Sequence, residues 1–171
     1  FKNVTPTKQN EYTGIFKGKN LIYITAEGFD KIAIDESLTP TLYKLANNGF
    51  VFENYYQPLF TVSTSDGEYM FLNSLIPKEG VWSFYRSSNI YLPFGIGNAF
   101  KREGYSTVNA YHDHTYTYYN RDKSHPNLGF DKYIGCGNGL EELINCKTWP
   151  ESDVEMINAC LLYTSDAADD L

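Results

Sequence analysis

Residues 20–27 have the sequence NLIYITAE, an apolar run rich in β-branched and aromatic residues that ends in a carboxylate. Such a run predicts a buried strand of a parallel sheet. In open α/β folds the ligand site lies beyond the carboxyl ends of the strands, so Glu27 is expected at that edge. Its carboxylate suits a hard metal ion, although a surface glutamate at a strand end would give the same pattern. The run therefore predicts an α/β fold with a parallel central sheet.

Residues 63–68, STSDGE, form a hydroxyl-rich run that opens a predicted helix. Ser65 and Glu68 have the spacing of a capping box, and an apolar helical face follows. Thr64 would then lie at a helix N-terminus, where unpaired N–H groups and the helix dipole stabilise an oxyanion or a phosphate. Thr64 is therefore a candidate nucleophile that a metal held by Glu27 would activate. Clusters of Ser, Thr and Asp also cap helices without any catalytic role.

Further helix and strand patterns alternate along the chain, which favours the same α/β class. The predicted helices cover 40–48 and 93–102, and the predicted strands cover 50–56 and 106–111. Strand 50–56 leads toward Thr64, and His112 follows strand 106–111. Because the carboxyl ends of parallel strands share one edge, His112 and Glu27 are expected to face one cleft. A further helix is predicted to begin at 151, with Ser152 as its cap.

A second polar cluster follows this strand. It consists of His112, the triplet Tyr119-Asn120-Arg121, and the stretch NLGFD at 127–131. Arg121 can offer a planar fork to a phosphate, and Tyr119 an aromatic wall with a hydroxyl.

These stretches together resemble the lipoteichoic acid synthases, phosphoglycerol transferases of the sulfatase and alkaline phosphatase superfamily. The resemblance implies the N-terminal part of a sulfatase-like sandwich, with a mainly parallel central sheet flanked by helices. It implies that Glu27 and Thr64 bind one divalent metal, Mn²⁺ or Mg²⁺. Thr64 would attack phosphatidylglycerol and pass its glycerol phosphate to a teichoic acid or glycolipid acceptor. His112, Tyr119 and Arg121 would surround the glycerol phosphate.

Two positions depart from the family pattern. Tyr119 replaces the usual Trp, and Gly28 stands where Ser often follows the glutamate. Neither substitution removes a functional group that the expected reaction needs, but both indicate a divergent branch of the family whose acceptor could differ.

The resemblance also predicts how the chain is organised. Residues 1–19 are expected to be a linker after transmembrane helices, and 20–159 an incomplete catalytic domain on the extracellular face of the cell membrane. Residues 160–171 resemble the translated sequence of a transposon adaptor used to prepare sequencing libraries, so we expect them not to be native. The family completes its metal shell with an Asp-His pair farther along. The chain alone is therefore expected to be inactive.

Composition narrows the remaining alternatives. The net charge is −7, or −4 without the three aspartates of 160–171, which argues against nucleic-acid binding. No apolar run approaches the roughly 18 residues that a membrane span needs.

Cys136 and Cys146 are equally compatible with a disulfide and with two free thiols. A sulfatase would need Pro and Arg after its nucleophile, which 64–67 lack. A phosphoethanolamine transferase, a phosphodiesterase and a non-catalytic surface module remain open.

Overall fold

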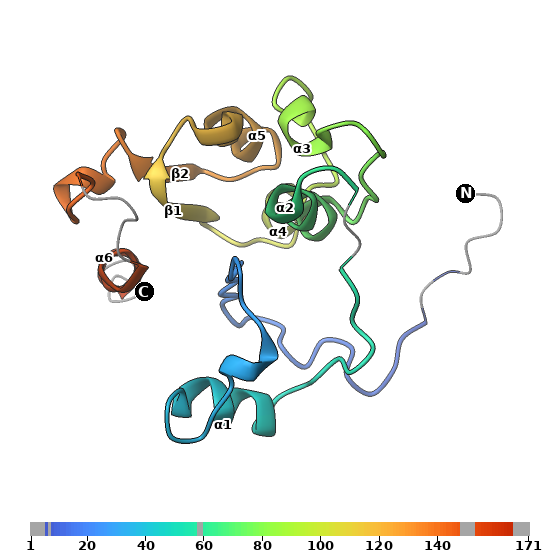
Figure 1. Ribbon diagram of the computed structural model, residues 1–171. Coiled ribbons are helices and arrows are strands. Elements are labelled where there is room, and N and C mark those ends of the chain that lie inside the picture. The colour runs from blue at the N-terminus through green and yellow to red at the C-terminus, as the bar shows by residue number, and fades with distance from the viewer. Residues whose placement is uncertain (1–5, 7, 58–59, 148–152, 166–171) are drawn as a thin grey trace.

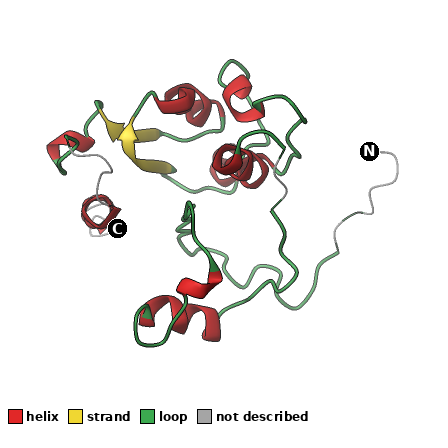
Figure 2. Ribbon diagram, viewed as in Figure 1, coloured by secondary structure: helices red, strands yellow, loops and turns green. Residues whose placement is uncertain are grey.

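The computed structural model describes residues 6, 8–57, 60–147 and 153–165. Its centre is a parallel pair of strands, β1 (Asn109–Thr115) and β2 (Lys132–Cys136), flanked by helices (Figures 1 and 2). The predicted mixed α/β class with a parallel sheet is therefore confirmed.

The helices have the following bounds. They are α1 (Pro40–Asn48), α2 (Ser63–Asn73), α3 (Ser83–Ser87), α4 (Ile96–Arg102), α5 (Arg121–Asn127) and α6 (Asp153–Ser165), with 3-10 turns η1 (Lys31–Ala33), η2 (Tyr118–Asn120) and η3 (Leu140–Glu142). Helix α1 matches its prediction, with proline in its first turn. Helix α4 begins three residues later than predicted. Helix α6 matches the helix predicted from 151, and its predicted cap Ser152 lies outside the described residues.

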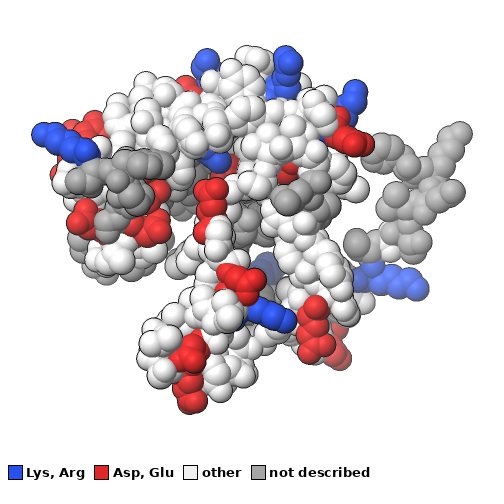
Figure 3. Space-filling view, viewed as in Figure 1, with Lys and Arg blue, Asp and Glu red and all other residues white. Residues whose placement is uncertain are grey.

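The predicted strands at 20–27 and 50–56 are wrong. Both segments are irregular, and their apolar side chains lie in solvent, with Ile22 74% and Phe52 80% exposed. A strand needs a hydrogen-bonding neighbour, and within the described ranges the sheet consists of β1 and β2 alone. Figure 3 shows acidic and basic side chains scattered over the lower part of the molecule, where α1 lies, with uncharged surface between them.

Strand β1 begins at Asn109 rather than 106 and extends to Thr115, so His112 lies inside the strand instead of after it. Helix α5 connects β1 to β2, which makes a βαβ unit. The pairing is regular from Asn109↔Lys132 to Tyr111↔Ile134 and then shifts before Thr115↔Cys136. His112 therefore occupies the irregular part of the ladder, where side chains are re-aimed.

The main hydrophobic core joins α2, α3 and the end of α5. Its buried members are Leu72, Phe84, Leu92 and Leu128. Helix α4 approaches closely because Gly97 has no side chain: a Cβ there would lie 2.7 Å from the backbone carbon of Gly129. The core thus fixes α2, which carries Thr64, against α5, which begins at Arg121.

His125 is part of this core, although its sequence context suggested no role. The ring packs against Phe84, Phe130 and Tyr133, with centroid distances of 5.7, 5.0 and 4.5 Å. Its Nδ1 lies 3.1 Å from the carbonyl oxygen of Arg121. Burial, with a smaller effect of Arg121, lowers the pKa of His125 to about 3.

We expect this histidine to make the fold sensitive to acid. Its folded pKa lies below the ordinary 6.5, so its stabilising contribution is complete above pH 6.5 and is lost as the pH falls toward 3. The free energy of unfolding should fall by a few kcal/mol, as an order of magnitude, between pH 7 and pH 4. Urea denaturation at several pH values measures this. His125→Phe should flatten the profile, and an equally steep profile in that variant would contradict the assignment.

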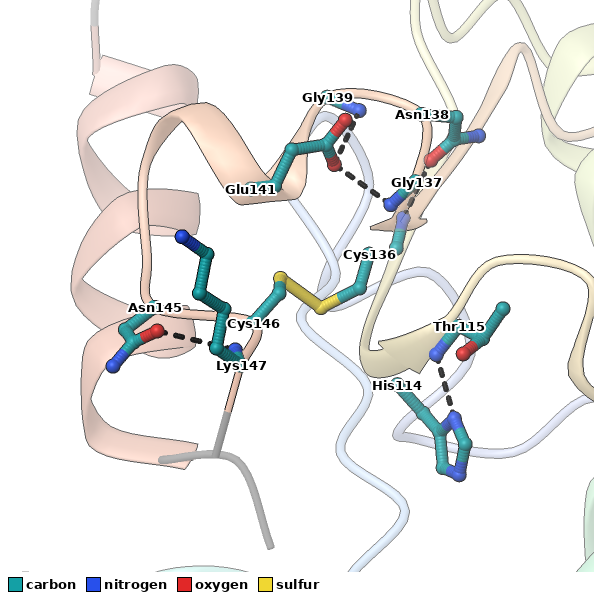
Figure 4. Close-up of a disulfide and its surroundings, with 11 residues drawn as sticks. His114, Thr115, Cys136, Gly137, Asn138, Gly139, Glu141, Asn145, Cys146 and Lys147 are labelled. Atoms are coloured by element: carbon teal, nitrogen blue, oxygen red, sulfur yellow. Dashed lines mark hydrogen bonds between the residues drawn. A yellow bond between two sulfur atoms is a disulfide. The ribbon is translucent and has the colours of Figure 1, made fainter. Parts of the chain in front are cut away.

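Cys136 and Cys146 form a disulfide, which settles the question that the sequence left open (Figure 4). Cys136 ends β2, and Cys146 follows the 3-10 turn η3. The bridge anchors a small second core that contains Leu140, Ile144 and Ala159 and so ties α6 to the sheet.

Removing the bridge should destabilise the chain. A loop closed over a separation of 10 residues contributes about 2–3 kcal/mol by the chain-entropy relation. The double variant Cys136→Ser/Cys146→Ser should lose that amount of unfolding free energy. Cys160→Ser, which changes a cysteine outside the bridge, is the control. Equal stability of the oxidised and double-serine chains would show that the bridge contributes nothing.

Candidate functional site

Helix α2 positions Thr64 in its first turn. The helix begins at Ser63 with Val62 as its N-cap residue, and no side chain caps it. The Asp66 carboxylate instead accepts N–H bonds from Phe60, Thr61 and Val62, at 3.2, 2.8 and 2.9 Å. This buried aspartate fixes the loop that enters the helix. Thr64 is half-buried at the helix N-terminus, as predicted.

The predicted capping box is wrong, because both of its side chains have other partners. The Ser65 hydroxyl accepts a hydrogen bond from Trp82 Nε1 at 3.1 Å. The Glu68 carboxylate pairs with Arg121, which is 53 positions away in the sequence. The two residues therefore connect the first turns of α2 to groups that the sequence places far away.

Arg121 is buried and clamped by Glu68. Its Nε lies 3.2 and 3.0 Å from the two carboxylate oxygens, and its Nη2 lies 3.0 and 2.9 Å from the same pair. Nη1 has only a long 3.4 Å contact to the Tyr118 carbonyl. Burial raises the pKa of Glu68, against the opposing effect of Arg121. The guanidinium that was expected to face a phosphate thus uses one edge for a carboxylate.

Tyr119 lies between Trp82 and the Tyr118 ring. The Trp82 ring meets it edge-on at 4.3 Å, and the Tyr118 ring stacks at 3.9 Å. The Arg121 guanidinium carbon lies 5.6 Å from the Tyr119 ring centroid. Tyr119 has φ +58°, a conformation that costs energy for a bulky side chain. The surrounding contacts hold it in that conformation, beside the first turn of α2.

His112 stacks over the Tyr118 ring at a centroid distance of 6.2 Å. Its Nδ1 is buried and has no hydrogen-bond partner within the described part of the chain. Burial, followed by the nearby positive charge of Arg121, lowers the pKa of His112 to about 4. The ring is therefore neutral at pH 7 and has a nitrogen available for a ligand.

Glu27 lies in a turn rather than at a strand end, and it is exposed. Its segment still runs along α2, because Tyr23 stacks on Phe71 at 3.7 Å. The Glu27 charge contributes to raising the pKa of Glu68 and of Tyr118, so Glu27 lies close to both.

The sequence predicts that Glu27 and Thr64 bind a metal ion, and the described residues supply only part of such a site. Within residues 6, 8–57, 60–147 and 153–165, no group of three or more His, Cys, Asp or Glu side chains is arranged to hold a metal ion. Glu27 and Thr64 alone do not close a metal site.

Sequence reasoning missed the connecting residues Glu68, Trp82 and Tyr118. The Glu68–Arg121 pair spans distant positions, and an ion pair of that kind leaves no local signal. Trp82 lies in the aromatic-rich stretch 76–91, which has no recognisable motif.

A family model described as Sulfatase matches residues 19–168. The chain belongs to the sulfatase family. Among curated relatives, Lipoteichoic acid synthase 2 of Bacillus subtilis (strain 168) is 32% identical over 132 residues, 73% of this chain and 20% of the relative. Lipoteichoic acid synthase 1 of the same strain is 31% identical over 159 residues, 86% of this chain and 23% of the relative. This sulfatase-family chain is thus lipoteichoic acid synthase-like.

A solved structure agrees with this assignment at the level of the fold. The crystal structure of the lipoteichoic acid synthase LtaP from Listeria monocytogenes matches with a TM-score of 0.66 at 23% identity, over 77% of this chain and 31% of that one. The sulfatase-family chain spans about a fifth of the length of the curated relatives. None of the helices in its described ranges combines the length and the apolar character of a membrane span.

Proposed function

We propose that this chain supplies the nucleophile half of a phosphoglycerol transferase in a longer protein. The observation that carries the proposal is the link between Thr64 and the cluster around Arg121. Trp82 joins Ser65 to Tyr119, and Glu68 joins α2 to Arg121. A hydroxyl at the N-terminus of a helix that is itself tied to a buried guanidinium and an aromatic wall suits a phosphate ester with a polar head group.

In the proposed reaction, Thr64 Oγ attacks the phosphorus of phosphatidylglycerol. The bond from phosphorus to the diacylglycerol oxygen breaks, and that oxygen takes up a proton. A hydroxyl of a teichoic acid or glycolipid acceptor then attacks the same phosphorus and releases the Thr64 hydroxyl. The unpaired N–H groups of the first turn of α2 stabilise the charge that develops on the phosphoryl oxygens.

His112, Tyr119 and Arg121 are proposed to hold the glycerol phosphate. Neutral His112 has an unpartnered Nδ1 that suits a glycerol hydroxyl. The Tyr119 ring forms a wall, and Arg121 meets a phosphoryl oxygen. Glu27 and Thr64 are proposed as two ligands of one Mn²⁺ or Mg²⁺, with the remaining ligands outside this chain. The site is proposed to lie on the extracellular face of the cell membrane.

The test is turnover of phosphatidylglycerol vesicles, measured as release of diacylglycerol. The longer protein should release diacylglycerol with added Mn²⁺ or Mg²⁺, whereas the 171-residue chain alone should release none. Preference for phosphatidylethanolamine or a sulfate ester by the longer protein would overturn the choice of substrate. Turnover by the 171-residue chain would overturn the proposal that the remaining metal ligands lie outside this chain.

A further inference from the structure

The Glu68–Arg121 pair has a specific geometry. A guanidinium has a side-on edge, made by Nε and one N–H of Nη2, and an end-on edge, made by Nη1 and the other N–H of Nη2. Glu68 occupies the side-on edge with both of its carboxylate oxygens, at 2.9–3.2 Å. Among the residues that the structure describes, the end-on edge has only the 3.4 Å contact of Nη1 to the Tyr118 carbonyl.

The pair also fixes where this edge lies. Glu68 is four residues after Thr64 on α2, so both side chains lie on one face of the helix, about one turn apart. The Arg121 side chain is 5% exposed and the Glu68 side chain 14%, and the Tyr118 and Tyr119 rings lie 5.7 and 5.6 Å from the guanidinium carbon. Arg121 therefore has little freedom to rotate while Glu68 is present.

Stability alone is a weak reason for such a pair. Two buried charges lose most of their hydration, and a well-packed apolar pair of similar size is often as stable. A carboxylate that also cancels the charge of Arg121 would weaken a site meant simply to bind phosphate in its ground state. The arrangement is suited to orienting the cation, because a fixed guanidinium costs no reorganisation during the reaction.

We propose that Glu68 is a positioning residue for phosphoryl transfer: it holds Arg121 by the side-on edge so that the end-on edge meets the phosphoryl oxygen beside Thr64. This inference rests on the proposed function and deepens it. It assigns to Glu68 a role in the geometry of transfer rather than in the capture of substrate.

The experiment compares Glu68→Gln with wild type in the longer protein, using phosphatidylglycerol vesicles. Glu68→Gln keeps the size of the side chain but removes its charge, so kcat should fall about 10- to 100-fold while KM changes less than about threefold. Glu68→Asp, which keeps the carboxylate, should recover part of the lost kcat. The exposed Glu79→Gln is the matched control and should behave as wild type.

A double-variant cycle separates positioning from a general effect on folding. If Glu68 acts only through Arg121, Glu68→Gln should cost little further kcat in an Arg121→Ala background. Thermal unfolding of each variant identifies the folded population, and rates are expressed per folded molecule. If Glu68→Gln does not fold, the comparison uses Glu68→Asp, whose side chain is one methylene shorter and should hold Arg121 less accurately, so that a smaller loss of kcat is expected and the same dependence on Arg121 is tested.

The outcomes are distinct. Any of three results overturns the positioning role: wild-type kcat per folded molecule in the tested Glu68 variant, a rise in KM without loss of kcat, or full additivity with Arg121→Ala. Each of these results leaves the proposed transferase activity intact. Absence of turnover by the wild-type longer protein overturns the proposed function and with it this inference.

Discussion

Thr64→Ala in the longer protein is expected to lower phosphatidylglycerol turnover by roughly a thousandfold or more. The substitution removes the oxygen that attacks the phosphorus in the first step of the proposed reaction, and loss of a nucleophile is among the largest single effects seen in enzymes. The half-buried Thr64 lies in the first turn of α2, so the alanine fits the helix. Initial rates of diacylglycerol release measure the effect.

Two neighbouring variants serve as controls. Thr64→Ser keeps a hydroxyl and should retain measurable turnover, whereas Ser63→Ala changes an exposed hydroxyl in the same turn and should keep wild-type turnover. Thr64→Ala with more than a tenth of wild-type activity would show that another group attacks the phosphorus.

Arg121→Ala should have the largest effect on stability. It leaves the Glu68 carboxylate buried without its cation, and breaking a buried pair in this way costs about 3–5 kcal/mol. Urea denaturation of the 171-residue chain gives the unfolding free energy. Arg86→Ala, which removes an exposed guanidinium, is the control.

The loss of unfolding free energy in Arg121→Ala should increase with pH. Burial already raises the pKa of Glu68, and Arg121 opposes that rise. Without Arg121 the folded pKa rises further, so the folded state favours the protonated carboxyl and loses stability as the pH rises above the ordinary value of 4.5. Arg121→Ala should therefore be more damaging at pH 8 than at pH 5. An equal loss at both values would mean that Glu68 is not the group left unpaired.

Local chemistry predicted α1 and the start of α2, but it did not predict α3 or α5. Proline at 40 and glycine at 49 bracket α1, and the hydroxyl run at 63–68 opens α2, because such signals act within a few residues. The strands were harder to predict. Segments 20–27 and 50–56 have strand-like composition, but a strand also needs a partner, and composition does not supply one.

The candidate site was likewise predicted where short motifs mark a residue and missed where distant segments meet. Thr64, His112, Tyr119 and Arg121 were identified from short motifs, and the structure connects three of them through aromatic and ionic contacts. Their roles remain predictions. Glu68 was assigned to a local cap because its spacing from Ser65 fits one. Its actual partner comes from α5, and only the folded chain brings the two together.

In the proposed mechanism, Thr64 carries the glycerol phosphate during transfer. The most direct test mixes the longer protein with phosphatidylglycerol vesicles, quenches the reaction in acid within one turnover, and locates any adduct by mass spectrometry of the peptide that contains residues 63–68. We expect a glycerophosphoryl group on Thr64 and none in Thr64→Ala. An adduct on Ser63 or Ser65, or transfer without any covalent adduct, would contradict it.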